Sequence, residues 1–336
     1  MCAMTTLVAV GACYVDLILS VDHYPNEDEK LRASRLTRRR GGNCPNTVEV
    51  LEQLIHIKEK QQEEKKENDF ESLSPVLVTV LPARSSPAVQ FVRDSFGARV
   101  DLTHCLYRED FHEPASSYII SSQRTSSRTI VNYNELPEMT HDEFNALIDR
   151  LDVKHSGGGM WFHFEGRIPD VNLQNIKSLR NSLPAATISV EVEKPGRLGL
   201  QELAAEADVV FYAKGWAQNA GYTEPKAFLH AQAPLTPKAK VIFCTWGEHG
   251  ASALELPSQS YVSCPTYKKE GASVVDTIGA GDTFIAGILY ALNFHGSSKS
   301  ESWTLERSLG FATELAGRKV IQEGFGGLGE QMAGKL

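Results

Sequence analysis

The sequence predicts an α/β protein built on a mostly parallel sheet, and three observations lead to that class. Beyond about residue 160, short runs of β-branched and aromatic residues alternate with segments of helical spacing. Such alternation is typical of a parallel sheet with helices on both faces. The 336 residues, 42% of them hydrophobic, suffice for one large core or two small ones. The predicted strands are 161–164, 187–192, 208–212 and 240–245, with helices that include 171–179 and 198–205.

The N-terminal third predicts further strands, one helix and a small β appendage. Two hairpin-like strand pairs suggest the appendage, and because neither an internal repeat nor a linker is visible, we expect one domain over 1–336 with a β lid. The lid segments are about 29–42 and 115–134. A charged, peripheral insertion over about 58–72 is either a solvated helix extension or a flexible segment. The remaining predicted elements are strands at 7–10, 15–19, 75–81, 100–107, 117–121 and 129–133 and a helix at 45–57.

The basic stretch 31–40 alternates only loosely between apolar and polar residues. We interpret its arginines Arg35, Arg38 and Arg39 as a solvated strand face, which is the commonest reason for charges on a strand.

Composition excludes several classes of function. A net charge of −8 argues against a nucleic-acid binder, which needs a basic surface. The six cysteines match no zinc spacing and are too sparse for a disulfide scaffold, so we expect reduced thiols and a cytoplasmic protein. We expect no membrane segment, because no window approaches about 18 apolar residues.

The motif that carries chemistry is V-V-D-T-I-G-A-G-D-T-F at 274–284. A β-branched run leads to Gly279, Ala280 and Gly281, and a helical pattern follows. Small residues at a helix start let backbone N–H groups approach a phosphate, and the helix dipole adds partial positive charge. Asp282, just inside that helix, would accept a proton from an incoming hydroxyl. From the residues alone, an aspartate that merely caps a helix beside a glycine turn is an equal alternative.

Two other patterns could indicate a nucleotide site or a metal site. Residues 324–329 fit G-x-G-x-x-G, but we expect no helix to follow so near the C-terminus, so a dinucleotide fingerprint is rejected. The chain also contains no P-loop motif. His163 and Glu165 lie two apart on a predicted strand, and we interpret His163 as a structural, hydrogen-bonded histidine.

The D-T-x-G-A-G-D segment at 276–282 resembles the signature of the ribokinase-like sugar kinases, a three-layer α/β fold with a small β lid or clasp. R-G-G-N-x-x-N at 40–46 resembles the N-terminal motif of the same family. Further segments resemble the ketohexokinase (fructokinase) branch, and the likeness covers about 10–327. These segments are V-D-H-Y-P-N-E-D at 21–28, S-R-T-I-V at 127–131, F-E-G-R at 164–167, V-E-V-E-K-P at 190–195, A-D-V-V-F at 207–211 and T-W-G-E-H-G at 245–250.

The resemblance implies a role for each residue that matches a family motif. Asp16 would bind sugar hydroxyls, with Gly42, Asn43 and Asn46 completing the pocket. Taken alone, the two asparagines are better explained by turn and helix-cap chemistry. Asp28 would reach the sugar site of a neighbouring subunit through a β-clasp homodimer; the alternative is a solvated loop carboxylate.

The remaining implied roles concern phosphate and nucleotide. Arg128 and Arg167 would contact the sugar or the transferred phosphate, unless they form surface ion pairs. Lys194, Glu248 and Gly250 would lie along the ATP site. Residues 279–281 would form the anion hole, Asp282 would be the base, and Mg²⁺ would accompany the ATP phosphates. The magnesium ligands stay unassigned, because 213–216 replaces the N-x-x-E motif of many relatives.

The predicted activity is transfer of the ATP γ-phosphoryl group to the C1 hydroxyl of a ketohexose, with D-fructose as the first expectation. One alternative is a kinase of the same fold for another sugar, a nucleoside or a sugar acid. Another is a non-catalytic family member that only binds ligand. A dehydrogenase would rest only on the glycine cluster at 324–329.

Overall fold

The computed structural model describes residues 4–65, 72–125, 127–151, 159–294 and 303–336. Its centre is an eight-stranded sheet in the order β14-β13-β12-β11-β10-β9-β1-β4. All neighbours from β12 to β4 pair in parallel, and the two strands at the other edge pair antiparallel. The strands are β1 (Met4–Val10), β4 (Ser72–Val78), β9 (Met160–Phe164), β10 (Thr187–Val192), β11 (Val209–Ala213), β12 (Val241–Thr245), β13 (Ala251–Glu255) and β14 (Ser260–Cys264).

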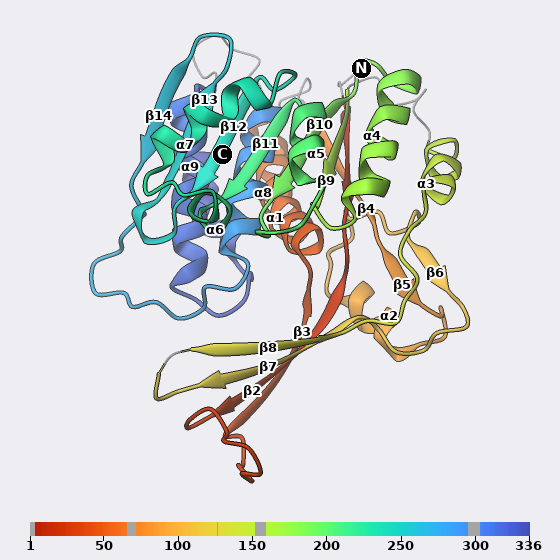
Figure 1. Cartoon of the computed structure of the whole chain (residues 1–336), viewed down its shortest axis with the longest axis vertical. Helices are drawn as coiled ribbons and strands as arrows, with labels where there is room; N and C mark the ends of the chain where they lie inside the picture. The colour runs from red at the N-terminus through yellow and green to blue at the C-terminus, as the bar shows by residue number, and fades with distance from the viewer. Residues whose placement is uncertain (1–3, 66–71, 126, 152–158, 295–302) are drawn as a thin grey trace.

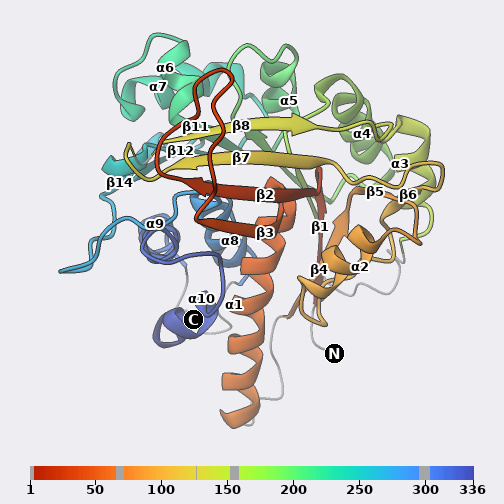
Figure 2. The same ribbon diagram turned by 90° about the horizontal axis from the view of Figure 1, so that it is seen from below.

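Helices cover both faces of this sheet, which gives three layers (Figure 2). One face packs against α1 (Asn43–Lys65), α8 (Ala280–Asn293), α9 (Leu305–Val320) and α10 (Leu328–Met332). The other face packs against α3 (His141–Ile148), α4 (Pro169–Ser182), α5 (Leu200–Glu206), α6 (Lys214–Asn219) and α7 (Pro225–Gln232). Strand β1 shows why both faces need cover: Leu7 and Ala9 join the first core, and Val8 and Val10 join the second.

A smaller four-stranded sheet, called here the small sheet, projects from the body of the molecule (Figure 1). Its order is β3-β2-β7-β8, with β2 and β7 parallel and the two outer pairings antiparallel. The strands are β2 (Tyr14–Val21), β3 (Arg35–Gly41), β7 (Ser116–Ser122) and β8 (Arg128–Tyr133). A two-stranded parallel sheet of β5 (Val80–Pro82) and β6 (Leu106–Arg108), with helix α2 (Pro87–Asp94), lies where the two larger sheets meet.

The structure confirms the predicted α/β class and its mostly parallel sheet, and it corrects two local expectations. The predicted strand 100–107 shrinks to Leu106–Arg108, with only an isolated bridge at Asp101 before it. The charged stretch after residue 57 takes the first of its two expected forms: it continues α1 as far as Lys65, and 66–71 lies outside the described residues. A short helix, α10, does begin inside the glycine cluster at 324–329, but helix α9 precedes it rather than a strand.

Two further properties concern the described residues only. None of their helices combines the length and the apolar character needed to cross a membrane. Their five cysteines form no disulfide with one another, and Cys2 lies outside this part of the chain.

Candidate active site

A cavity of about 740 Å³, called here the large cavity, opens between the ends of the parallel strands, the start of α8 and the inner face of the small sheet. Clefts at the carboxyl ends of parallel strands are the usual ligand sites of open α/β sheets. Most of the predicted site residues line it: Asp16, Gly42, Asn43, Asn46, Arg128, Arg167, Lys194, Gly279, Gly281 and Asp282.

The segment 276–281, called here the glycine turn, delivers the chain to the first turn of α8 beside the cavity. Gly279 is the N-cap of α8 with φ 80°, and a Cβ there would lie 2.3 Å from Phe325 Cζ. Only glycine fits both the left-handed backbone and the close ring. Gly279 and Gly281 line the cavity, whereas Ala280 begins the helix between them. Ala280 N donates to the Thr277 carbonyl at 3.4 Å, and the next N–H groups of this helix start can receive an anion.

Asp282 sits in the first turn of α8 with only 9% of its surface exposed. Asn46 Nδ2 donates a hydrogen bond to Asp282 Oδ2 at 2.7 Å, and Arg40 Nη1 donates to Asn46 Oδ1 at 2.6 Å. Arg40 is also buried and pairs with Glu49. Burial first, and the charge of Glu191 second, raise the pKa of Asp282 well above its usual range. A carboxylate of raised pKa is a stronger proton acceptor, as a general base requires.

Three carboxylates on the cavity wall were given no role in the site by the sequence. Glu165, Glu191 and Glu193 line it at the ends of strands β9 and β10. Asn43 Nδ2 donates to Glu191 Oε2 at 2.7 Å and to Glu193 Oε2 at 2.9 Å. Burial is the first cause that raises the pKa of Glu165 to about 7 and that of Glu191 to about 8. A glutamate directly after a buried apolar strand, as in F-E and V-E-V-E, is the signal that could have identified them.

Beneath this wall, ligand-type atoms of Cys44, His163 and Glu191 lie within 4.8 Å of one another, all buried. His163 Nδ1 lies 2.9 Å from Ser189 Oγ, and His163 Nε2 lies 3.0 Å from Glu191 Oε1. Cys44 Sγ donates to the Val10 carbonyl at 3.3 Å. Burial lowers the pKa of His163 to about 3, so the ring is neutral and packs as a hydrogen-bonded core residue.

Asp16 reaches the cavity from strand β2, where Gly41 gives it room and Gly42 packs against the Ala12 backbone. Asp16 is 6% exposed, and a Cβ on Gly41 would lie 2.5 Å from Asp16 Oδ2. Gly42 has φ 105°, and a Cβ there would lie 2.1 Å from the Ala12 carbonyl oxygen. Burial raises the pKa of Asp16, opposed by a hydrogen bond from Ser117 and by the charge of Arg39.

The interpretation of Arg39 as part of a solvated face is wrong. Its side chain is only 16% exposed, and Arg39 Nη1 donates to Asp276 Oδ2 at 2.9 Å. Successive strand residues alternate between faces, so Arg39 points inward while its neighbour Arg38 points outward and stacks on the Phe91 ring at 4.3 Å. Arg35 is exposed and pairs with Glu323.

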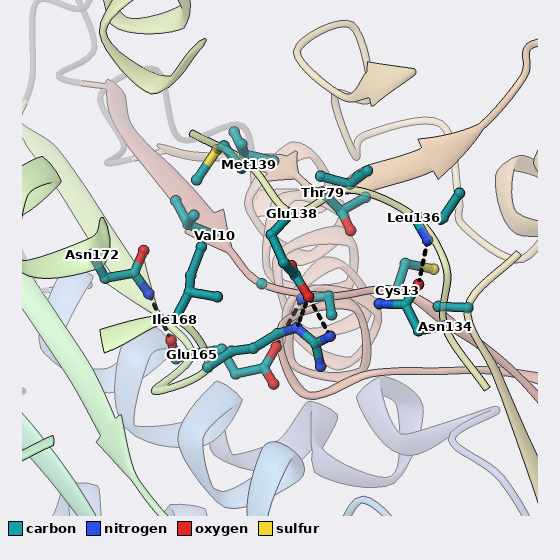
Figure 3. Close-up of a pocket in the computed structure, with 16 residues that line it drawn as sticks. Val10, Cys13, Thr79, Asn134, Leu136, Glu138, Met139, Glu165, Ile168 and Asn172 are labelled. Atoms are coloured by element: carbon teal, nitrogen blue, oxygen red, sulfur yellow. Dashed lines mark hydrogen bonds and ion pairs between the residues drawn. The ribbon is translucent and has the colours of Figure 1, made fainter. Parts of the chain in front are cut away.

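The two other predicted arginines both line the cavity but differ in their partners. Arg128 Nη1 donates to Thr277 Oγ1 at 2.9 Å. Arg167 Nη1 donates to the Tyr14 hydroxyl at 2.6 Å, and Arg167 Nε donates to Glu138 Oε1 at 3.0 Å. A second cavity of about 40 Å³ is drawn in Figure 3, and it shares Arg167 and Glu165 with the large cavity.

Besides Ala280, three predicted residues are not among those that line the large cavity. Asp28 is exposed on the loop between β2 and β3, with φ 62°. Glu248 is exposed and accepts a hydrogen bond from Lys214 Nζ at 2.8 Å. At Gly250, a Cβ would lie 2.0 Å from the Cys264 carbonyl oxygen, so its backbone packs against the chain after β14.

An open parallel sheet, a glycine turn at a helix start and a buried carboxylate beside it define the class of the ribokinase-like kinases. The comparison with family models gives the family itself. Residues 4–328 match the model of the pfkB family carbohydrate kinases, and the chain belongs to this family.

Individual relatives agree in sequence and in fold. The chain is 29% identical to the ketohexokinase of Mus musculus over 330 residues, which cover 96% of this chain and 98% of that protein. The ribokinase of Giardia lamblia superposes with a TM-score of 0.73 at 15% identity, covering 96% of each chain. The ribokinase of Arabidopsis thaliana, in complex with ribose and ATP, superposes with a TM-score of 0.69 at 18% identity and covers 96% of this chain and 94% of that one.

Proposed function

We propose that this sugar kinase transfers the γ-phosphoryl group of ATP to the C1 hydroxyl of a ketohexose, with D-fructose giving fructose 1-phosphate. The observation that carries the proposal is the buried Asp282 beside the N–H groups of α8, at the floor of a cavity lined by hydroxyl-binding side chains. A base and an anion site at one point are what phosphoryl transfer to an alcohol needs.

In this proposal Asp282 Oδ accepts the proton of the sugar hydroxyl. The hydroxyl oxygen forms the new bond to the γ-phosphorus while the bond from phosphorus to the β–γ bridging oxygen breaks, and ADP leaves. The N–H groups at 279–281 stabilise the charge on the transferred group. Asn46 holds Asp282 in place, because its amide is itself fixed by Arg40.

The cavity suits a magnesium–ATP complex. Mg²⁺ prefers oxygen ligands, and the exposed Glu193 beside the buried Glu191 supplies carboxylate oxygens on the wall. When bound with ATP, the ion would offset the negative charge of the phosphates. We assign Lys194 to the nucleotide because its cationic side chain lines the same cavity.

For the sugar, we assign Asp16, Gly42, Asn43, Asn46 and Arg167. Buried carboxylates and amides select hydroxyl-rich ligands, because an analogue lacking one hydroxyl leaves a buried group unpaired. The 29% identity to a ketohexokinase supports fructose as the first choice. Another sugar, a nucleoside or a sugar acid is the competing assignment, and a non-catalytic binding protein is the second.

We further propose a homodimer through the small sheet acting as a β-clasp, with Asp28 reaching the partner's cavity. The outer face of this sheet carries apolar side chains with large exposure: Leu36 is 62%, Val131 60% and Tyr118 49% exposed. A patch of this kind on a four-stranded sheet calls for a covering surface. The clasp comprises the lid segments 29–42 and 115–134.

The test is ADP release with Mg-ATP and a panel of D-fructose, D-ribose, adenosine and 2-keto-3-deoxygluconate, with the product identified by ³¹P NMR. Selective turnover of fructose with phosphate on C1 supports the proposal. Turnover of a different member keeps the chemistry and replaces the substrate. ATP binding without any turnover supports the non-catalytic alternative.

A further inference from the structure

The glycine turn is held in place by an unusual concentration of charge on Asp276. Asp276 Oδ2 accepts from Arg39 Nη1 at 2.9 Å, from Lys319 Nζ at 2.7 Å and from Gly324 N at 3.3 Å. Its other oxygen accepts from Ile278 N at 3.0 Å. The carboxylate thus fixes the backbone that leads into Gly279, and its two cationic partners come from different parts of the molecule.

Lys319 belongs to the same layer as the turn. It lies in α9, its side chain is fully buried, and Lys319 Nζ also donates to the Asp276 carbonyl at 3.0 Å. Helices α8 and α9 pack against each other in one core. The lysine therefore secures the turn from within the large sheet's own helical layer.

Arg39 comes instead from strand β3 of the small sheet, and it has a second carboxylate within reach. Arg39 Nε lies 3.6 Å from Asp16 Oδ2, while its Nη1 bonds Asp276. Asp16 and Arg39 are register partners on β2 and β3, so both side chains stand on the same face. One rigid guanidinium thus spans the carboxylate proposed to hold the sugar and the carboxylate that fixes the phosphate-binding turn.

We propose that Arg39 is a positioning residue. By pairing with both Asp16 and Asp276, it fixes the position of the bound sugar relative to the transferred phosphoryl group. The inference rests on the proposed function, because Asp16 matters to it as a sugar ligand. Arginine suits the task and lysine does not: the planar guanidinium presents several donors in fixed directions, whereas an ammonium is a single point charge. Reactions between two bound substrates fall about 10²-fold for a misplacement of about 1 Å.

The experiment compares Arg39→Met, Arg39→Lys and the matched control Arg38→Met, a substitution at the adjacent arginine of the same strand that points outward onto Phe91. Steady-state rates are measured with Mg-ATP and the sugar that the unmodified enzyme turns over. We expect Arg39→Met to lower kcat about 10- to 100-fold and to raise KM for the sugar. Arg39→Lys should bring KM for the sugar back close to the original value but should not restore kcat. Arg38→Met should leave both constants near the original values.

A kcat for Arg39→Met within about twofold of the original enzyme, or full recovery of kcat in Arg39→Lys, overturns the proposal. So does an equal loss in Arg38→Met, because the effect would then be general to the strand. Circular dichroism and melting temperature establish that each variant is folded; should Arg39→Met fail to fold, the kcat of Arg39→Lys decides.

A second readout separates failure of this inference from failure of the proposed function. Hydrogen exchange of a peptide spanning 276–282 requires no sugar. Faster exchange in Arg39→Met than in Arg38→Met supports this role of Arg39 even where every sugar of the panel is inert, an outcome that would reject only the proposed substrate. Identical exchange in all variants overturns the proposal that Arg39 positions the glycine turn.

Discussion

The two sheets of this molecule are built on opposite plans. The central strands of the large sheet are buried on both faces, as in β9, where all five residues are buried. Strand β8 of the small sheet is exposed along its whole length. The large sheet is covered by its own helices, whereas the small sheet lends one face to the cavity and leaves Leu36, Tyr118 and Val131 of the other face exposed.

The two sheets contribute different residues to the site. The end of the large sheet and the start of α8 bring Asp282, Glu191 and the glycine turn together on a rigid frame. The small sheet brings Asp16 and Arg128 on strands that are anchored mainly at one end (Figure 1). We infer that chemistry resides with the large sheet and substrate closure with the small one.

The largest expected contrast is in stability. Phe162 is fully buried in β9 and packs against Phe144, so Phe162→Ala should lower the free energy of unfolding by about 3–5 kcal/mol. Val131→Thr, a change of similar shape at a 60% exposed position of β8, should lower it by less than about 0.5 kcal/mol. Urea denaturation measures both. Comparable losses in the two variants would remove the distinction between the sheets.

The next effect concerns the uncovered face. Tyr118→Asp places a charge in the middle of the proposed dimer surface and should weaken self-association at least tenfold, or about 1.4 kcal/mol. Leu198→Asp is the matched control, since Leu198 is 90% exposed but lies outside the small sheet. Sedimentation velocity at micromolar protein reports the change. A Tyr118→Asp protein that associates like the control would show that another surface, or none, forms the dimer.

The pH profile probes the electrostatics of the large-sheet site. The proposed base must be ionised to act, and the pKa of Asp282 is raised by burial and then by Glu191. Activity should therefore fall, on the acid side, at a higher pH than an ordinary aspartate would give. Glu191→Gln removes a cause that raises the pKa, so the acid limb of kcat/KM should move to lower pH.

Glu206→Gln is the control for this shift, because Glu206 pairs with Lys238 at the end of α5, outside the residues that line the large cavity. An acid limb that moves to higher pH in Glu191→Gln would contradict the assigned cause.

The smallest effect is expected at Glu248. The carboxylate is exposed and paired with Lys214 outside the cavity lining, and an exposed ion pair contributes about 0–1 kcal/mol. Glu248→Gln should change KM for ATP by less than about twofold in steady-state kinetics. A tenfold rise in KM for ATP would instead support the nucleotide-binding role that its motif predicts for Glu248.

Local patterns predicted the fold class and much of the site. Alternating strand and helix patterns, and glycines followed by a carboxylate at a helix start, depend on neighbouring residues and are visible in one sequence. They led to Asp282, whereas Asn46 and Asp16 were assigned from the resemblance to the ribokinase-like kinases; the structure brings all three to one cavity.

What the sequence could not predict depends on which strands become neighbours. Glu165 and Glu191 lie 26 positions apart and reach one wall only because β9 and β10 pair in parallel. Arg39 looked like surface charge because its partner Asp276 lies 237 positions along the chain. Pairing between charges that are distant in the chain produces no periodic sequence pattern, so such residues can be identified only from the structure.

The central claim is that Asp282 is the base of a sugar kinase, and its most direct test is turnover by the Asp282→Asn variant. With Mg-ATP and the sugar preferred by the unmodified enzyme, we expect kcat to fall by about 10²–10⁴, because a positioned base is lost. ADP binding, measured by calorimetry, should stay within a few-fold, because the glycine turn remains. Turnover near the original rate with a folded Asp282→Asn protein would contradict the account.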